Sequence, residues 1–313
     1  MALSSPSSLF KGTDELMEQV ALYCKSYRQD VKRARRLALS VSKFNDERLP
    51  FFLSVPKADL KLFEEHLHGL SVSLISDEEI IHSNPSIDPK KIASIPGGLS
   101  QQIVKSEFWR LKLSEAYVCV DSDCQFIRPF GRSDFMTPEG YPYTVMHEAK
   151  ELLQFAAIYD MPDILESYKR EHEGIMRIFE RTGRAYDFGP PPMIWGAAVW
   201  QDLDVNFLKP RNMSFLDAIM QFPAEILWYG EAMLKFRPYP LMPVEPLFKF
   251  YHYEPQYIIG QRDGETSAKL AKNFLGVCHQ SNWEKDIDFD PKRRGPLSRL
   301  ARAVRRNVLG RYR

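Results

Sequence analysis

The sequence has few cysteines and no long apolar run. Only four of its 313 residues are cysteines (Cys24, Cys119, Cys124 and Cys278), and no two of them form a Cys-x-x-Cys pair. Structural zinc sites and small secreted disulfide domains depend on such spacings or on denser cysteines. No window approaches the roughly 18–20 consecutive apolar residues of a membrane-spanning helix. We therefore expect reduced thiols in or near the core, and no zinc site.

The N-terminus also lacks a targeting signal. Residues 1–10 are rich in serine and contain no apolar core of signal-peptide length. Hydrophobic residues make up 44% of the chain and charged residues 27%, which excludes a mainly disordered protein. The sequence predicts a folded cytoplasmic protein with one large domain or two small ones.

The near-zero net charge hides two oppositely charged regions. The chain carries 42 Lys and Arg against 41 Asp and Glu, a net charge of +1. Residues 292–313 contain nine Lys and Arg and no acidic residue, so residues 1–291 carry a net charge of −8. The sequence therefore predicts an acidic body followed by a strongly basic tail.

Strand and helix patterns alternate through the first 130 residues. The helical patterns, with Ser100 as the expected N-cap of the third, cover residues 30–43, 57–67 and 100–112. Short apolar strands are predicted at residues 20–24, 51–55, 72–75 and 116–120. This order predicts a mostly parallel sheet with helices on both faces, which binds its ligand at the carboxyl ends of the strands.

The second half is less regular. Helices are predicted at residues 143–159, 161–181, 214–220 and 225–235, and an aromatic strand at 248–253. Gly189 and three prolines after it indicate a rigid loop. No segment of the body is a clear linker that would divide it into independent domains. Residues 284–296, after the body, are typical of a linker.

The end of the fourth predicted strand carries two carboxylates. Asp121 and Asp123, separated by Ser122, follow the apolar strand directly. Carboxylates in this arrangement suit a hard divalent cation such as Mg²⁺ or Mn²⁺, which keeps open positions for diphosphate oxygens. The alternative is an Asx turn that ends the strand without a ligand.

Two segments carry a resemblance to a known class. Residues 97–105, with Gln101, Gln102 and Lys105, and residues 117–129 resemble glycosyltransferases of the GT-A fold, specifically a bacterial group known only as a domain of unknown function. In that group a Gln-Gln-x-x-Lys helix precedes an Asp-Ser/Ala-Asp strand end. The resemblance covers residues 18–283 and is specific around 97–130. It implies sugar transfer from a nucleoside-diphosphate donor, with Mn²⁺ or Mg²⁺.

The resemblance also implies how the chain is organised. The expected fold is a GT-A-type, Rossmann-like, mostly parallel sheet flanked by helices, followed by a C-terminal basic amphipathic helix. Residues 18–130 are the expected nucleotide-binding half, and residues 131–283 the acceptor-binding half. An N-terminal extension at 1–17 and a linker with the basic tail at 284–313 complete the chain.

Donor-binding residues are implied at the strand ends and on the helix before the acidic strand. Lys25 and Ser26 follow the first strand, and Asp77 follows the third; all three are expected at the nucleoside or its phosphates. Tyr23 is expected either to stack on the base or to belong to the core. Gln102 and Lys105, with Gln101 as the alternative, share a helix face that meets the donor.

The metal assignment extends the carboxylate pair. Asp123 is the expected metal ligand, and Asp121 is expected to contact the metal and the ribose, with Ser122 beside the donor. GT-A enzymes often add a histidine from near the end of the domain, which implies His279 as a third ligand or diphosphate contact.

The resemblance places further residues around the donor and the acceptor. Asn282 and Trp283 are expected to close over the donor, and His147 to face a substrate. Glu225 is the preferred catalytic base, because apolar neighbours raise the pKa of a carboxyl, and Glu231 is the alternative. The segments 190–195 and 251–253 are interpreted as acceptor walls, with core packing as the alternative.

The basic tail has its own pattern. Apolar residues at 297, 300, 301, 304 and 308 alternate with arginines at helical spacing, which is typical of an interfacial membrane helix. Residues 297–313 are therefore expected to bind an anionic membrane at its inner face. A nucleic-acid patch and a solvated tail are the alternatives; aromatic interleaving is almost absent, so no nucleic-acid partner is expected.

Together these features favour a glycosyltransferase that builds a cell-surface glycan such as lipopolysaccharide or capsule. One alternative is a nucleotidyltransferase, which would carry a glycine-rich loop near the first strand, where residues 25–28 contain no glycine. The other is a non-catalytic membrane-associated protein that binds sugar nucleotides.

Overall fold

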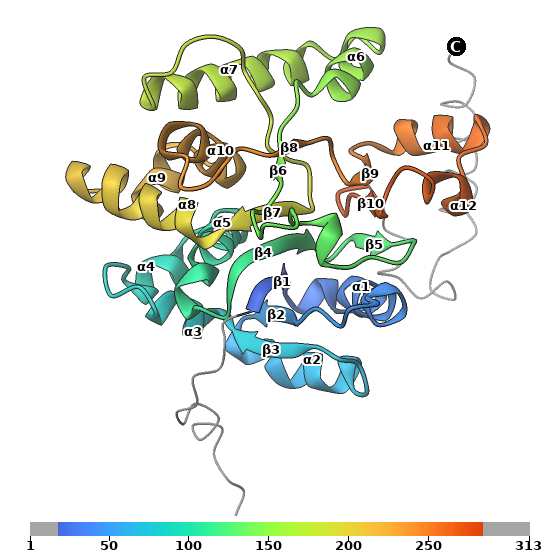
Figure 1. The fold of residues 1–313 in the computed structure, drawn as a ribbon, viewed down its shortest axis with the longest axis horizontal. Helices are drawn as coiled ribbons and strands as arrows, with labels where there is room; N and C mark the ends of the chain where they lie inside the picture. Colours follow the sequence, from blue (N-terminus) through green and yellow to red (C-terminus); the bar gives the residue numbers. More distant parts are fainter. Residues whose placement is uncertain (1–17, 284–313) are drawn as a thin grey trace, which may run out of the picture.

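The computed structural model describes residues 18–283 (Figure 1). The expected N-terminal extension, the linker and the basic helix at 297–313 lie outside the described residues. All four cysteines are free and buried, as expected. No helix among residues 18–283 combines the length and the apolar character that crossing a bilayer requires.

A five-stranded sheet forms the centre of the molecule. Its order is β3-β2-β1-β4-β7, with β1 to β4 parallel and β7 antiparallel to β4. The bounds are β1 Glu18–Lys25, β2 Phe51–Val55, β3 Ser73–Ser76, β4 Ser114–Asp121 and β7 Met193–Gly196. The expected mostly parallel sheet is confirmed. In its central pair, β1 and β4, Lys25 lies in register with Asp121, so both strands end at the same edge of the sheet.

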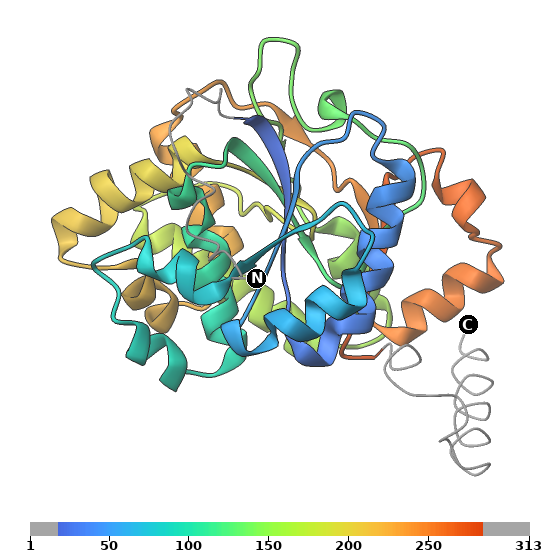
Figure 2. The same ribbon diagram turned by 90° about the horizontal axis from the view of Figure 1, so that it is seen from below.

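Alternating side chains of the strands supply two separate cores. Val118 and Val120 of β4 belong to the core beneath α1 and α2, whereas Tyr117 and Cys119 belong to the core on the opposite face. Figure 2 shows these helices on the two sides of the sheet. On the first side lie α1 Val31–Phe44 and α2 Leu60–Leu67, and on the other α3 Asp77–His82, α4 Pro89–Ser94, α5 Gly97–Glu107, α8 Ala197–Asp202, α9 Phe215–Gln221 and α10 Glu225–Phe236.

Helix starts differ from expectation in two places. The third predicted helix begins at Gly97 with Pro96 as N-cap, and Ser100 lies inside it, so the expected Ser100 N-cap is wrong. The acidic stretch after β3 is itself helical: the Ser76 hydroxyl accepts a hydrogen bond from the Glu79 N–H at 3.1 Å and caps α3. Ser-x-x-Glu is a capping signal that the sequence carries.

A second sheet joins the acidic motif to the end of the described chain. Its order is β5-β10-β9, and β10 runs antiparallel to β5, which follows the motif directly. The bounds are β5 Cys124–Phe126, β9 Phe248–Tyr251 and β10 Gly276–His279, and a two-stranded sheet pairs β6 Thr144–Val145 with β8 Pro243–Val244. The last described strand therefore returns to the edge where β4 ends.

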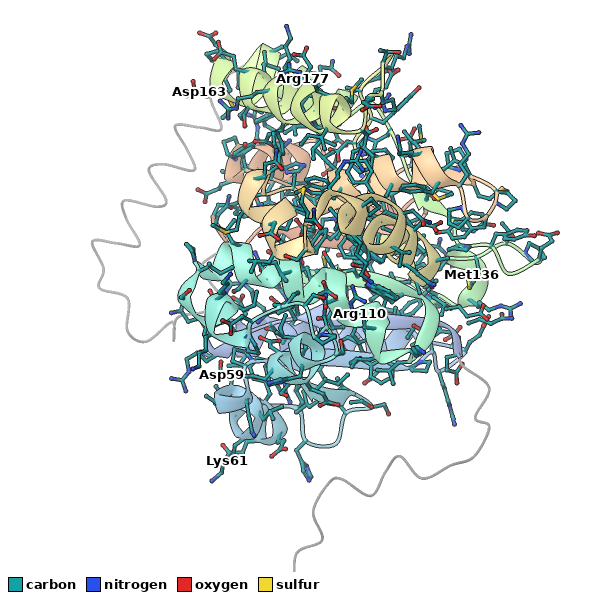
Figure 3. All side chains as sticks on the ribbon, turned by 90° about the vertical axis from the view of Figure 1, so that its left-hand side faces the viewer. Asp59, Lys61, Arg110, Met136, Asp163 and Arg177 are labelled. Atoms are coloured by element: carbon teal, nitrogen blue, oxygen red, sulfur yellow. The ribbon has the colours of Figure 1, made fainter. Side chains whose placement is uncertain are left out.

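Two helices form a hairpin on one side of the molecule. They are α6 Lys150–Ile158 and α7 Pro162–Ile178, and they lie above α10 and β9 in Figure 1. Figure 3 shows α7, marked by Asp163 and Arg177, on the side opposite α2, which Lys61 marks. The prediction of a helix at 143–159 is wrong for its first half. In that half β6 pairs with β8, and Ala149 has a left-handed φ of 51° just before α6.

The remaining elements are short. Two helices, α11 Glu254–Arg262 and α12 Ser267–Leu270, lie between β9 and β10. A π-helical turn covers Leu203–Leu208, and 3-10 turns cover Arg28–Asp30, Lys57–Asp59, Phe108–Leu111, Arg132–Asp134 and Lys209–Arg211. The division into halves at residue 130 stays a prediction.

Candidate active site

The carboxyl end of β1 carries a buried ion pair. Nζ of Lys25 lies 2.7 Å from Oδ2 of Asp77, the first residue of α3. Burial raises the pKa of Asp77, and the charge of Lys25 opposes that shift. Ser26 is buried beside them, and its hydroxyl has no hydrogen-bond partner among residues 18–283. Three expected donor-site residues therefore meet at this edge.

Tyr23 does not reach the edge. Its side chain is 0% exposed, its ring stacks on Phe108 with centroids 3.9 Å apart, and its hydroxyl lies 2.9 Å from that of Ser54. Tyr23 and Lys25 point to the same face of β1, and Lys25 lies two residues nearer the end of the strand, beyond the core that buries Tyr23. The expectation that Tyr23 stacks on a nucleobase is corrected: the ring is a core side chain.

Lys105 forms the centre of the site. Its side chain is only 5% exposed, and its Nζ lies 2.6 Å from Oδ1 of Asp121 and 4.0 Å from Oε1 of Glu225. Burial alone would lower the pKa of Lys105, but the neighbouring charges, Asp121 foremost, raise it well above its ordinary value. The lysine is therefore a fixed buried cation that joins α5, the end of β4 and the start of α10.

Gln102 supports the same arrangement one helical turn earlier. Its Oε1 accepts a hydrogen bond from the Glu225 N–H at 3.3 Å, and its Nε2 donates to the Gly98 carbonyl at 3.2 Å. Gln101 is exposed. The structure thus brings Gln102 and Lys105 to the site, and Gln102 acts by positioning α10.

Asp123 is buried, and each of its carboxylate oxygens accepts a hydrogen bond. Its Oδ1 accepts from the Cys278 thiol at 3.1 Å, and its Oδ2 accepts from the Ser281 N–H at 2.8 Å. Burial, followed by the charge of Asp121, raises the pKa of Asp123 to about 6. Asp121 is one-third exposed, and Ser122 between them is buried. The two carboxylates are therefore close enough to repel each other.

Asp121 and Asp123 have the ligand chemistry that a hard divalent cation prefers. The charge of Asp121 contributes to the raised pKa of Asp123, a repulsion that a bound cation would relieve, and Mg²⁺ and Mn²⁺ prefer oxygen ligands. Among residues 18–283, one group of potential ligand atoms lies within 4.8 Å of one another: Asp123, Cys124 and Cys278. Its two thiols are soft ligands that Mg²⁺ and Mn²⁺ disfavour. Asp121 and Asp123 are the better-suited donor set.

His279 does not join that group. Its ring lies 5.0 Å from the Tyr257 centroid, 5.4 Å from that of Tyr251 and 5.9 Å from that of Trp283. Burial, followed by the charge of Arg36, lowers the pKa of His279 to about 4. The imidazole is therefore neutral at pH 7, but aromatic rings surround it, and its role as a ligand stays a prediction.

The closing segment after His279 is anchored. The Trp283 indole N–H donates to the Tyr251 carbonyl at 2.8 Å, and the Asn282 side chain donates to that of Gln280 at 3.0 Å. Ser281, through its backbone N–H, is the residue of this segment that contacts Asp123. Because this contact uses the backbone N–H, the residue type at position 281 gives no indication of it in the sequence.

Glu225 and Glu231 start from one helix but differ in their surroundings. Glu225 begins α10, is 8% exposed and lines a cavity of about 480 Å³; burial raises its pKa, and Lys105 opposes the shift. Glu231 is buried, and both its oxygens accept from Arg181, at 2.5 and 2.6 Å. Glu225 therefore reaches a cavity, whereas Glu231 is held in a buried ion pair with Arg181; the role of Glu225 as a base stays a prediction.

His147 is likewise engaged on both ring nitrogens. Its Nδ1 accepts from the Ala149 N–H at 3.0 Å, and its Nε2 donates to the Gly189 carbonyl. It lines a second cavity of about 550 Å³ together with Pro190 and His252. Of the expected wall 190–195, the residues from Met193 onward form the buried strand β7 instead.

Part of α7 lines the first cavity, although none of its residues was expected at the site. Asp163, Ser167 and Glu171 follow one another at i, i+4 spacing, and Tyr168 and His172 lie beside them. Asp187 lines both cavities. The regular polar spacing on α7 is a signal that could have identified this face, but nothing local indicated that the face covers a cavity.

The profile of a family described as a family of unknown function (DUF6492) matches residues 19–178. This match spans more than half of the chain, and the chain belongs to that family. The result agrees with the resemblance to a group known only as a domain of unknown function. A search of curated proteins found no match.

Two solved structures show similar chains at low identity. Mouse xyloside xylosyltransferase 1 in its apo form has 9% identity and a TM-score of 0.45, over 84% of this chain and 98% of its own. Galactosyltransferase LgtC in complex with donor and acceptor sugar analogues has 12% identity and a TM-score of 0.48, over 93% of this chain and 95% of its own.

Proposed function

We propose that this protein is a GT-A-type glycosyltransferase that moves a sugar from a nucleoside-diphosphate donor to a glycan or glycolipid of the cell surface. One observation carries the proposal: Lys105 joins Asp121 and Glu225 at the edge where β1 and β4 end. This edge is where parallel α/β sheets bind their ligands.

The donor binds at the end of β1 and β4. Lys25 and Asp77 contact the nucleoside, and the ammonium group of Lys105 faces the diphosphate, whose charge it offsets. Asp121 and Asp123 would hold Mn²⁺ or Mg²⁺, and such a cation supplies Lewis-acid stabilisation of the leaving diphosphate.

In an inverting transfer, one base takes the proton of the acceptor hydroxyl. The acceptor hydroxyl oxygen forms a bond to the anomeric carbon while the bond from that carbon to the diphosphate oxygen breaks, and the transition state is oxocarbenium-like. The hydroxyl proton passes to Glu225, and the electron pair leaves with the nucleoside diphosphate. Burial keeps the affinity of Glu225 for a proton high, and Lys105 keeps the carboxylate ionised before the step.

A donor panel tests the proposal. The full chain is incubated with nucleotide sugars and Mn²⁺, and slow release of nucleoside diphosphate is measured. We expect one donor to be hydrolysed and Asp123→Ala to abolish the release. Full activity of Asp123→Ala would refute the metal assignment, and the absence of binding and hydrolysis for every donor would refute the enzyme. Pyrophosphate release from a nucleoside triphosphate and a sugar phosphate would indicate a nucleotidyltransferase instead.

The tail proposal stands on sequence alone. Nine Lys and Arg without an acidic residue in 292–313 would hold the acidic body on the inner face of an anionic membrane. Deletion after Asp290 should abolish binding to anionic liposomes and leave hydrolysis of a soluble donor nearly intact. Unchanged liposome binding would refute the anchor.

A further inference from the structure

Two adjoining cavities lie beneath the α6–α7 hairpin, and we refer to them together as the paired cavity. The first, of about 480 Å³, includes Glu225, and the second, of about 550 Å³, includes His252. They share Leu152 and Asp187 in their walls. The paired cavity therefore extends from the proposed base to the aromatic residues of β9.

Carboxylates predominate among the charged residues in the walls of the paired cavity. They include one lysine, Lys150, and no arginine. The carboxylate residues in these walls are Glu148, Glu151, Asp163, Glu171, Asp187, Glu225 and Glu245. A ligand in this cavity is therefore exposed to a negative potential.

Part of that charge has no counterion. Within residues 18–283, Glu148 and Glu151 have ion-pair partners, whereas Asp163, Glu171 and Asp187 have none. Glu171 accepts a hydrogen bond from the Ser167 hydroxyl at 2.8 Å, and Asp187 accepts one from the Gly189 N–H at 3.0 Å. Both contacts leave the negative charge in place, so these carboxylates add to the negative potential of the cavity.

A buried histidine points to the same kind of ligand. His172 is 6% exposed, and its Nδ1 donates to the Tyr168 carbonyl at 2.7 Å. Its Nε2 is buried and has no hydrogen-bond partner among residues 18–283. His172 thus places an unpaired ring nitrogen in the wall of the first cavity, next to Glu171.

We propose that the paired cavity binds the acceptor through a protonated amine, so that the acceptor is an amino sugar with a free amine. This inference rests on the proposed function and narrows its acceptor. An ammonium group would donate hydrogen bonds to the Glu171 carboxylate beside His172, and Asp163, about 12 Å away along α7, adds to the negative potential around it. The rings of Tyr168 and Tyr253 add favourable faces for a cation. Sugars with phosphate or carboxylate groups are repelled.

Equilibrium binding without any donor tests the inference. The full chain is titrated with the di- and trisaccharides of glucosamine, galactosamine and mannosamine, and with their N-acetylated forms. We expect at least one free-amine saccharide to bind about tenfold more tightly than its N-acetylated form, with a difference that shrinks as salt is raised. Equal or tighter binding of the N-acetylated forms, or no binding of any free amine, would overturn the inference.

Variants locate the site. Glu171→Gln should weaken free-amine binding about tenfold and Asp163→Asn by a smaller factor, and both should leave binding of the N-acetylated form unchanged. Glu173→Gln is the matched control, because Glu173 lies on the same helix, is exposed and pairs with Lys169 away from these walls. Unfolding curves show that the variants are folded. Wild-type affinity in both cavity variants would overturn the assignment.

The outcome separates this inference from the proposed function. Donor hydrolysis without a preference for amines would refute the amino-sugar acceptor and leave the glycosyltransferase proposal intact. Amine-selective binding that Glu171→Gln removes, in a protein that hydrolyses no donor, would keep the binding site and refute the enzyme.

Discussion

The donor edge and the paired cavity differ in how their carboxylates are balanced, although they meet at Glu225. At the donor edge, buried lysines pair with carboxylates: Lys25 lies 2.7 Å from Asp77, and Lys105 lies 2.6 Å from Asp121. In the paired cavity, carboxylates without ion pairs predominate, with Glu171 as an example. The donor edge therefore offers ammonium groups to an anionic donor, whereas the paired cavity offers carboxylates to a cationic acceptor.

The largest effect is expected from Glu225→Gln, because Glu225 lies where the two regions meet. Loss of the base should lower kcat about 10²–10⁴-fold and change the KM for the donor little. Since burial raises the pKa of Glu225, wild-type kcat should fall as pH is lowered, through a pKa above that of an ordinary glutamate. A protonated Glu225 cannot accept the acceptor proton. The variant should lack this acid limb; an unchanged limb would contradict the role.

The next largest effect is expected from Lys105→Met, which removes the buried cation of the donor edge. The donor diphosphate then loses a fixed charge-assisted contact, and kcat/KM should fall about 10²–10³-fold. Donor affinity by calorimetry should fall with it, whereas binding of saccharides in the paired cavity should remain. Lys61→Met, at an exposed position of α2, is the control. Unchanged donor binding would remove Lys105 from the donor site.

The smallest effect on function is expected from Arg181→Met, which acts outside both regions. The substitution leaves the buried Glu231 carboxylate without its partner and should lower the free energy of unfolding by about 3 kcal/mol. Urea denaturation measures this loss. Activity per folded molecule should be unchanged, and a loss of kcat larger than the folded fraction explains would place Glu231 back among the candidate bases.

The first half of the fold could be predicted because its patterns are local. The apolar runs that form β1, β2 and β4 alternate clearly with amphipathic helices, and the carboxylates after β4 follow from strand geometry alone. Tyr23 shows the limit of this reasoning. A tyrosine two residues before a strand end looks the same in a sequence whether it faces the core or a ligand, and packing on Phe108 decides the matter.

The second half could not be predicted to the same extent, because its elements depend on partners that are distant in the chain. Met193–Gly196 is a strand only because it pairs with β4, and Thr144–Val145 only because it pairs with β8. The polar face of α7 can be recognised as a cavity wall only in the folded chain, where it lines one cavity with the start of α10. Glu225 could be singled out from its apolar neighbours, but its link to Lys105 is a tertiary contact.

The hydrogen bonds that Cys278 and Ser281 donate to Asp123 have a consequence for biosynthesis. The two partners of this carboxylate are 155 and 158 positions further along the chain. At about 5–20 residues per second, a ribosome reaches Ser281 roughly 10–30 s after Asp123. During that interval the parallel strands β1 to β4 and Lys105, the partner of Asp121, are already synthesised, but Asp123 lacks Cys278 and Ser281. The donor edge is therefore among the last parts of the described region to be completed, and a nascent chain cannot bind its donor in the final geometry.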